Sequence, residues 1–90
     1  MEKTIIKNLI EKSNIIYDAL YTAEDTKIWE KESEAAAKFD SLVKRNFAFK
    51  LLVSIAVQEM GDYISSDREA AAFYLAYLEI KDSYKKNGGK

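Results

Sequence analysis

The chain has 90 residues, contains no Cys, His or Pro, and has 14 basic and 15 acidic side chains, for a net charge of −1. This composition excludes disulfides, thiolate chemistry and histidine-based catalysis or metal binding, and the even charge balance gives no basic footprint for nucleic acid. A chain of this length forms one domain with a thin core, so a partner subunit is the remaining source of added stability.

The first predicted helix covers residues 4–21. One stripe of residues, spaced by three and four, has the pattern of an amphipathic helix packed on a core. The stripe consists of Ile6, Ile10, Ser13, Tyr17 and Leu20, flanked by Ile5, Leu9 and Ile16. A turn follows, in which Asp25 or Thr26 is a suitable N-cap for the next helix.

The middle of the chain, residues 25–64, carries an apolar residue at every seventh position. These positions are Ile28, Ala35, Leu42, Phe49, Ala56 and Tyr63. A repeat that stays in one phase predicts a single continuous helix, about 60 Å long at 1.5 Å per residue, that supercoils with a neighbour as in a coiled coil. Gly61 is an alternative end of this helix, as a C-cap.

A break near Asn46 is the alternative to the long helix. The continuous helix predicts a three-helix bundle, whereas a break predicts a four-helix up-down bundle. No Gly or Pro marks a break there. Asn46 would occupy a polar position in the seam of a continuous helix, where such residues often set register and oligomeric state. Both versions are all-α.

The last predicted helix covers residues 67–86. Ser66 and Glu69 have the spacing of a capping box, in which each side chain accepts a hydrogen bond from a free backbone N–H. Lys85 and Lys86 lie in the last turn, where positive charge suits the helix dipole.

This helix has two apolar stripes on nearly opposite sides. The first stripe suits the core and consists of Phe73, Tyr77, Ile80 and Tyr84. The second consists of Ala71, Tyr74, Leu75 and Leu78. A helix that is apolar on both sides is buried on both sides. Three helices of this size leave the second stripe uncovered, so we predict that a partner covers it.

Other interface candidates lie in the middle segment. Phe47, Leu51 and Ile55 lie off the seam of the predicted long helix. Trp29 lies near its start and is a residue type typical of interface anchors, although packing against the first helix is the alternative. Acidic and basic residues alternate over residues 24–40, which indicates a solvated face, with a docking surface for a basic partner as the alternative.

No pattern of residues predicts catalysis, a cofactor or a metal site. The nearest nucleophile pair, Lys50 and Ser54, belongs to a polar stripe that suits a solvated helix face. The most apolar stretch is too short for a membrane span, which needs about 20 residues, and no secretory signal is evident. We therefore expect a cytoplasmic protein that is not an enzyme.

By elimination, the sequence predicts a non-enzymatic protein that binds a partner stoichiometrically, as a regulator, inhibitor or adaptor. We expect a homodimer, a complex with another protein, or both. The excess of Lys over Arg and the frequent Ile, Asn and Tyr indicate an AT-rich genome, such as that of a low-GC bacterium or its phage or plasmid.

Two other functions stay open. One is a nucleic-acid-associated transcriptional regulator, for which Lys44, Arg45 and Lys50 supply a small basic cluster. Against it, the last helix would present Asp67 and Glu69 to the phosphates. The other is a bacteriocin-immunity-type protein, because such proteins are helical bundles near this size.

Overall fold

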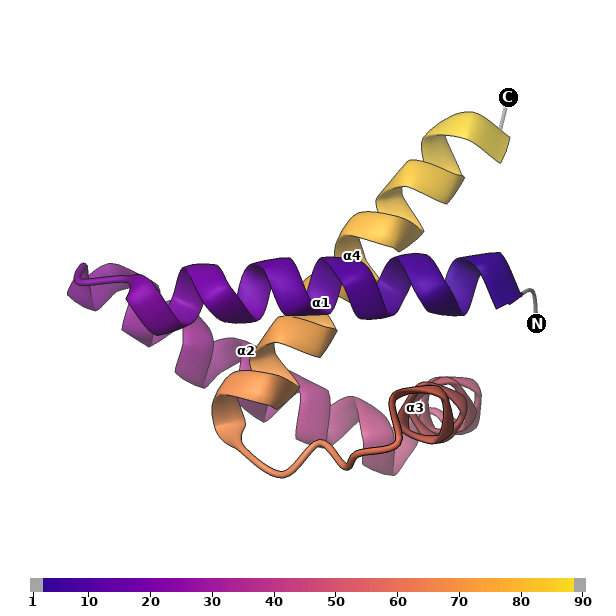
Figure 1. Ribbon diagram of the computed structural model, residues 1–90, viewed down its shortest axis with the longest axis horizontal. Helices are drawn as coiled ribbons and strands as arrows, with labels where there is room; N and C mark the ends of the chain where they lie inside the picture. The colour runs from indigo at the N-terminus through magenta and orange to yellow at the C-terminus, as the bar shows by residue number, and fades with distance from the viewer. Residues whose placement is uncertain (1–2, 89–90) are drawn as a thin grey trace.

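The computed structural model describes residues 3–88, with side chains over residues 4–83. These residues form four helices, α1 (Lys3–Thr22), α2 (Thr26–Arg45), α3 (Phe47–Met60) and α4 (Asp67–Gly88) (Figure 1). The predicted all-helical class is confirmed for this part of the chain. None of the described helices has the length and apolar character that a membrane span requires.

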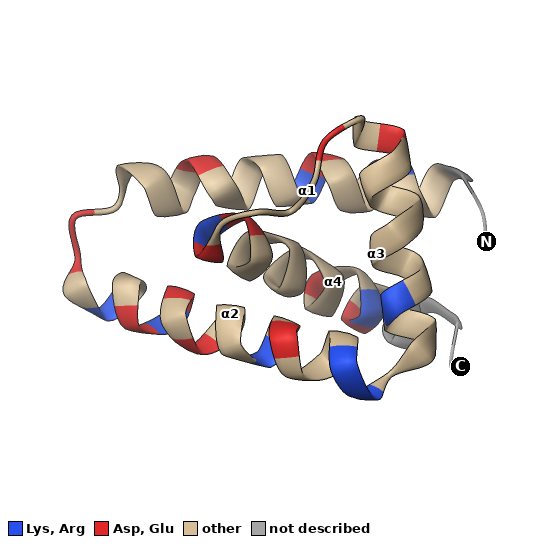
Figure 2. Ribbon diagram, turned by 90° about the horizontal axis from the view of Figure 1, so that it is seen from below, with Lys and Arg blue, Asp and Glu red and all other residues tan. Residues whose placement is uncertain are grey.

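The last helix in the chain lies at the centre of the fold. α1 and α2 run in opposite directions, and α4 passes obliquely between them (Figures 1 and 2). α3 crosses the end of this layer, where α1 begins and α2 ends (Figure 2). Consecutive helices therefore do not alternate up and down, and the up-down arrangement is wrong although the number of helices in that alternative is right.

Small side chains allow α4 to lie between two helices. Four alanines on its first half are buried, namely Ala70, Ala71, Ala72 and Ala76. Helix axes can approach more closely where the contact residues are small. Three of these alanines form one apolar cluster with Leu20 of α1 and with Ala35 and Ala36 of α2. The first half of α4 is thus covered on both sides by its own chain.

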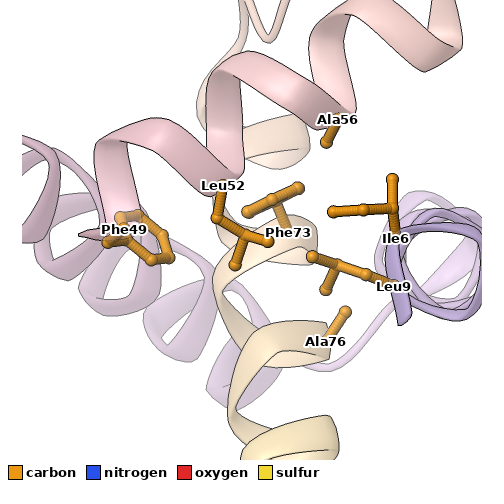
Figure 3. Packing of buried hydrophobic residues seen from close by; sticks show 7 residues of the cluster. All are labelled: Ile6, Leu9, Phe49, Leu52, Ala56, Phe73 and Ala76. Carbon is orange, nitrogen blue, oxygen red and sulfur yellow. The ribbon is translucent and has the colours of Figure 1, made fainter. Parts of the chain in front are cut away.

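A second cluster lies where α3 meets α1 and α4. Its buried members are Ile6, Leu9, Phe49, Leu52, Ala56, Phe73 and Ala76 (Figure 3). Phe39 of α2 packs beside it, and the rings of Phe39, Phe49 and Phe73 meet edge to face with centroids 5.6 to 6.0 Å apart. This geometry is favoured between aromatic rings and joins α2, α3 and α4 at one point.

The single helix predicted over residues 25–64 is wrong, and the alternative break at Asn46 is confirmed. Asn46 has extended dihedral angles, φ −120° and ψ 106°. Its backbone N–H donates to the Leu42 carbonyl at the end of α2 (2.8 Å), and its side-chain oxygen accepts from the Phe49 N–H at the start of α3 (3.0 Å). One extended residue redirects the chain without shifting the seven-residue repeat, so Ala35, Phe49 and Ala56 still reach buried positions.

The other helix ends follow the predicted capping residues. Asp25 accepts a hydrogen bond from the Lys27 N–H and is the N-cap of α2. Gly61 ends α3 in the left-handed region, at φ 72°, which suits glycine. The capping box at α4 is confirmed, because the Glu69 N–H donates to Ser66 Oγ and the Ser66 N–H donates to the Glu69 carboxylate, both at 3.1 Å.

Some predicted positions end up elsewhere or are not described. Tyr63 belongs to the seven-residue repeat, yet its side chain is 78% exposed because Gly61 ends α3 two residues earlier. The side chains of Tyr84, Lys85 and Lys86 lie outside the described residues.

Candidate functional site

The first turns of α3 present two large apolar side chains to solvent. Phe47 is 73% exposed and Leu51, one turn later, is 47% exposed. Lys50 lies between them in sequence and is also exposed. We call Phe47, Lys50 and Leu51 the α3 corner.

The position of the α3 corner follows from the break at Asn46. The inward face of α3 is fixed by Phe49, Leu52 and Ala56, which are buried against α1 and α4. At 100° per residue, Phe47 and Leu51 then lie on the opposite face. Because a capped helix start holds them, these two side chains are presented on a rigid element rather than on a loop.

Most of the second apolar stripe of α4 is covered by the chain itself. Ala71 is 0% exposed, and Tyr74 and Leu75 are half-buried against the cluster that joins α1, α2 and α4. Leu78 remains exposed. Ala71 is therefore not available to a partner, since α4 lies between two helices rather than on the surface of one.

The two remaining candidates differ in exposure. Ile55 is half-buried and packs against the cluster at the α3 end of the molecule. Trp29, in the first turn of α2, is 47% exposed and belongs to neither cluster. Trp29 is thus a surface aromatic residue, separate from the α3 corner by the length of α2.

The basic cluster predicted from the sequence is divided between two elements. Lys44 and Arg45 lie in the last turn of α2, whereas Lys50 lies on α3. Lys44 forms an ion pair with Asp40, at 3.1 Å, in which both side chains are largely exposed. Such surface pairs contribute little to stability, so Lys44 is available to another carboxylate.

Arg68 of α4 forms an ion pair with α2 and a cation–π contact with α1, and no pattern in the sequence indicates either contact. The Arg68 side chain donates to the Glu32 carboxylate at 3.0 Å, with exposed fractions of 31% and 16%. This hydrogen bond raises the pKa of Arg68 above its ordinary value, so the guanidinium stays charged. The guanidinium also lies over the ring of Tyr21, 5.5 Å from its centroid. The arrangement joins α4 to α2 and α1.

One small hollow lies beside the core. It has a volume of about 300 Å³ and lies between α1, the end of α3 and the start of α4. Its lining includes Ser13, Tyr17, Glu69 and Phe73. The Ser13 hydroxyl donates to the Leu9 carbonyl, and the Glu69 carboxylate caps α4, so these polar groups already serve the fold.

The described residues include no group of three or more carboxylates close enough to hold a metal ion. Lys50 and Ser54 are both exposed on the outer face of α3. Exposed side chains of this kind lack the water-excluded surroundings that activate a nucleophile.

No family model, curated protein or solved structure matches this chain.

Proposed function

We propose that this chain is a non-enzymatic protein that binds another protein stoichiometrically through the α3 corner, as a regulator, inhibitor or adaptor. The observation that carries this proposal is the exposure of Phe47 beside Leu51 on a capped helix start. Neither side chain is needed to fill the core, which Phe49 and Leu52 on the same helix complete.

The energetics favour an anchoring role for these two residues. Burying a Phe or Leu side chain is worth about 1.5–3 kcal/mol each, so the pair would supply much of the affinity of a small interface. The side chains stand on a capped helix, so little conformational entropy is lost when a partner binds. Lys50 beside them favours a partner surface with an apolar pocket and an acidic rim.

The proposal also includes the cellular location of the protein and the kind of organism it comes from. We place it in the cytoplasm of a low-GC bacterium or of a cell that carries its phage or plasmid. The absence of Cys suits a reducing compartment, where disulfides are rare.

Copurification from the native cells tests the proposal. The double variant Phe47→Ser, Leu51→Ser should lose a protein that copurifies in equal amount with the wild type. The matched control is Ile15→Ser, because Ile15 is an exposed apolar residue on α1, outside the corner. Retention of the copurifying protein by the corner variant, or its loss from the control as well, would contradict this function.

A further inference from the structure

The hollow between α1, the end of α3 and the start of α4 extends from the surface toward the core. Asn14, one of its lining residues, is exposed, whereas Ala72 and Phe73 are only 1% exposed. Most of the lining is apolar, and this part consists of Tyr17, Met60, Ile64, Ala72 and Phe73. Water in such a place finds few polar partners, so an apolar molecule displaces it favourably.

The volume of the hollow sets the size of the molecule that fits into it. The hollow measures about 300 Å³. This is roughly twice the volume of an apolar cavity of ~150 Å³ that holds benzene, and it lies at the lower end of the range for small-molecule sites. The hollow therefore suits a body of two fused rings rather than a segment of a protein.

The lining favours an aromatic body over an aliphatic one. Tyr17 from α1 and Phe73 from α4 contribute rings, and Met60 at the end of α3 contributes a thioether. An aromatic ligand packs well against both kinds of group, through offset or edge-to-face ring contacts and through sulfur–ring contacts. Phe73 already meets Phe39 and Phe49 edge to face, so its ring is held in place before a ligand binds.

Glu69 alone is charged among the described residues that line the hollow. All four hydrogen bonds that its carboxylate accepts, from the N–H and hydroxyl groups of Ser65 and Ser66, end on Oε1. Capping therefore occupies one oxygen and leaves Oε2 to a further donor. Glu69 also belongs to none of the ion pairs of the described residues. A half-buried carboxylate beside an apolar wall favours a positively charged donor and disfavours an anion.

We propose that the hollow binds a small arylalkylamine, with its fused rings between Tyr17, Met60 and Phe73 and its ammonium group at Glu69. This goes beyond the proposed function, because it involves no residue of the α3 corner, which lies at the other end of α3. At the efficiency usual for a ligand of about twelve non-hydrogen atoms, we expect a dissociation constant of roughly 0.1–1 mM.

Tryptamine is a suitable probe, because its two-ring indole carries an ammonium group on a short aliphatic chain. Titration of the isotope-labelled protein, followed by NMR, should shift the backbone signals of residues around the hollow, such as Tyr17, Ala72 and Phe73. Indoleacetate has the same rings with a carboxylate and should bind at least about tenfold more weakly, since its charge is like that of Glu69. Uncharged methylindole should bind with an intermediate affinity.

The variant Glu69→Gln tests the charge, because it keeps an oxygen that can cap α4. It should weaken tryptamine binding about tenfold and leave methylindole binding unchanged. Glu34→Gln is the matched control with the same change in net charge, since Glu34 is exposed on α2 and does not line the hollow. This control should bind tryptamine like the wild type.

The variant Ala72→Leu tests the hollow itself, because the larger side chain would occupy part of it. It should weaken the binding of tryptamine and of methylindole alike. Circular dichroism should show unchanged helicity for every variant. The proposal is overturned if the wild type does not bind tryptamine at millimolar concentration, if the shifted signals lie away from the hollow, or if Glu69→Gln binds tryptamine as tightly as the wild type. The α3 corner is intact in every variant, so the copurification test of the proposed function is independent of these results.

Discussion

Asn46 decides at the scale of one residue whether the middle of the chain is one helix or two. Its backbone N–H satisfies a carbonyl at the end of α2 and its side chain satisfies an N–H at the start of α3. An Asn side chain is among the best N-caps because its oxygen reaches backbone donors that the first turn leaves free. The exposure of Phe47 is a direct result of the break, since α3 starts immediately after Asn46.

The substitution Asn46→Ala should destabilise the fold by about 1 kcal/mol, because Ala leaves the Phe49 N–H without its side-chain partner. Asn46→Ser should lose much less, since a hydroxyl can accept the same hydrogen bond. Urea titration followed by circular dichroism measures both. Asn8→Ala on the exposed side of α1 is the control and should be close to neutral. An Asn46→Ala protein as stable as the wild type would contradict the capping role.

Ser66→Ala should also cost about 1 kcal/mol, because the Glu69 N–H then loses its acceptor at the start of α4. The matched control is Ser65→Ala. The Ser65 hydroxyl donates only to the Glu69 carboxylate, which keeps its bonds from two backbone N–H groups, so a smaller loss is expected. Denaturant midpoints of the two variants can be compared directly, and equal midpoints would count against a specific cap at Ser66.

At the scale of the element, α4 shows why apolar surface in a sequence does not convert directly into a partner interface. Its two stripes predict burial on both sides, and this is correct for Ala71, Tyr74 and Leu75. What the stripes do not specify is whether the cover comes from the same chain. The run of alanines is the missing signal, because small residues let α1 and α2 approach the helix from opposite sides.

Ala76→Leu should destabilise the protein by about 1–3 kcal/mol, because the added carbons have no room in a closely packed core. Ala19→Leu is the control, since Ala19 is exposed on α1 and the larger side chain extends into solvent there. Thermal unfolding of both variants measures the difference. If Ala76→Leu leaves the midpoint unchanged, α4 is not held as tightly between its neighbours as described.

At the scale of the whole molecule, the sequence predicts the helical class, the caps and most of the buried positions, but not the arrangement. The seven-residue repeat passes through the break because both pieces of the middle segment face the same core. The Arg68–Glu32 pair could not be inferred either, since the two residues lie 36 apart in the chain and meet only after α4 enters the layer. Of the candidate interface residues, Phe47, Leu51, Trp29 and Leu78 stay exposed, whereas Ala71 does not.

Removal of the Arg68 side chain should destabilise the fold, because it breaks contacts of α4 with both α2 and α1. Arg68→Met should lower the midpoint of thermal unfolding more than Lys12→Met, which breaks an exposed pair with Glu79. The Arg68 variant leaves a mostly buried carboxylate without its partner, whereas the carboxylate left in the Lys12 variant is hydrated. Differential scanning calorimetry of the two variants measures both midpoints. A smaller decrease for Arg68→Met than for Lys12→Met would contradict a stabilising role of the Arg68–Glu32 pair.

The central place of α4 has a consequence for how the chain acquires its fold during synthesis. α1 and α2 make most of their contacts with α4 and few with each other. A ribosome releases α1, α2 and α3 before it releases α4, so the emerging helices have no completed core to join. The apolar faces of α1, α2 and α3 therefore stay exposed until residues 67–88 emerge. This core can form only after α4 has left the exit tunnel.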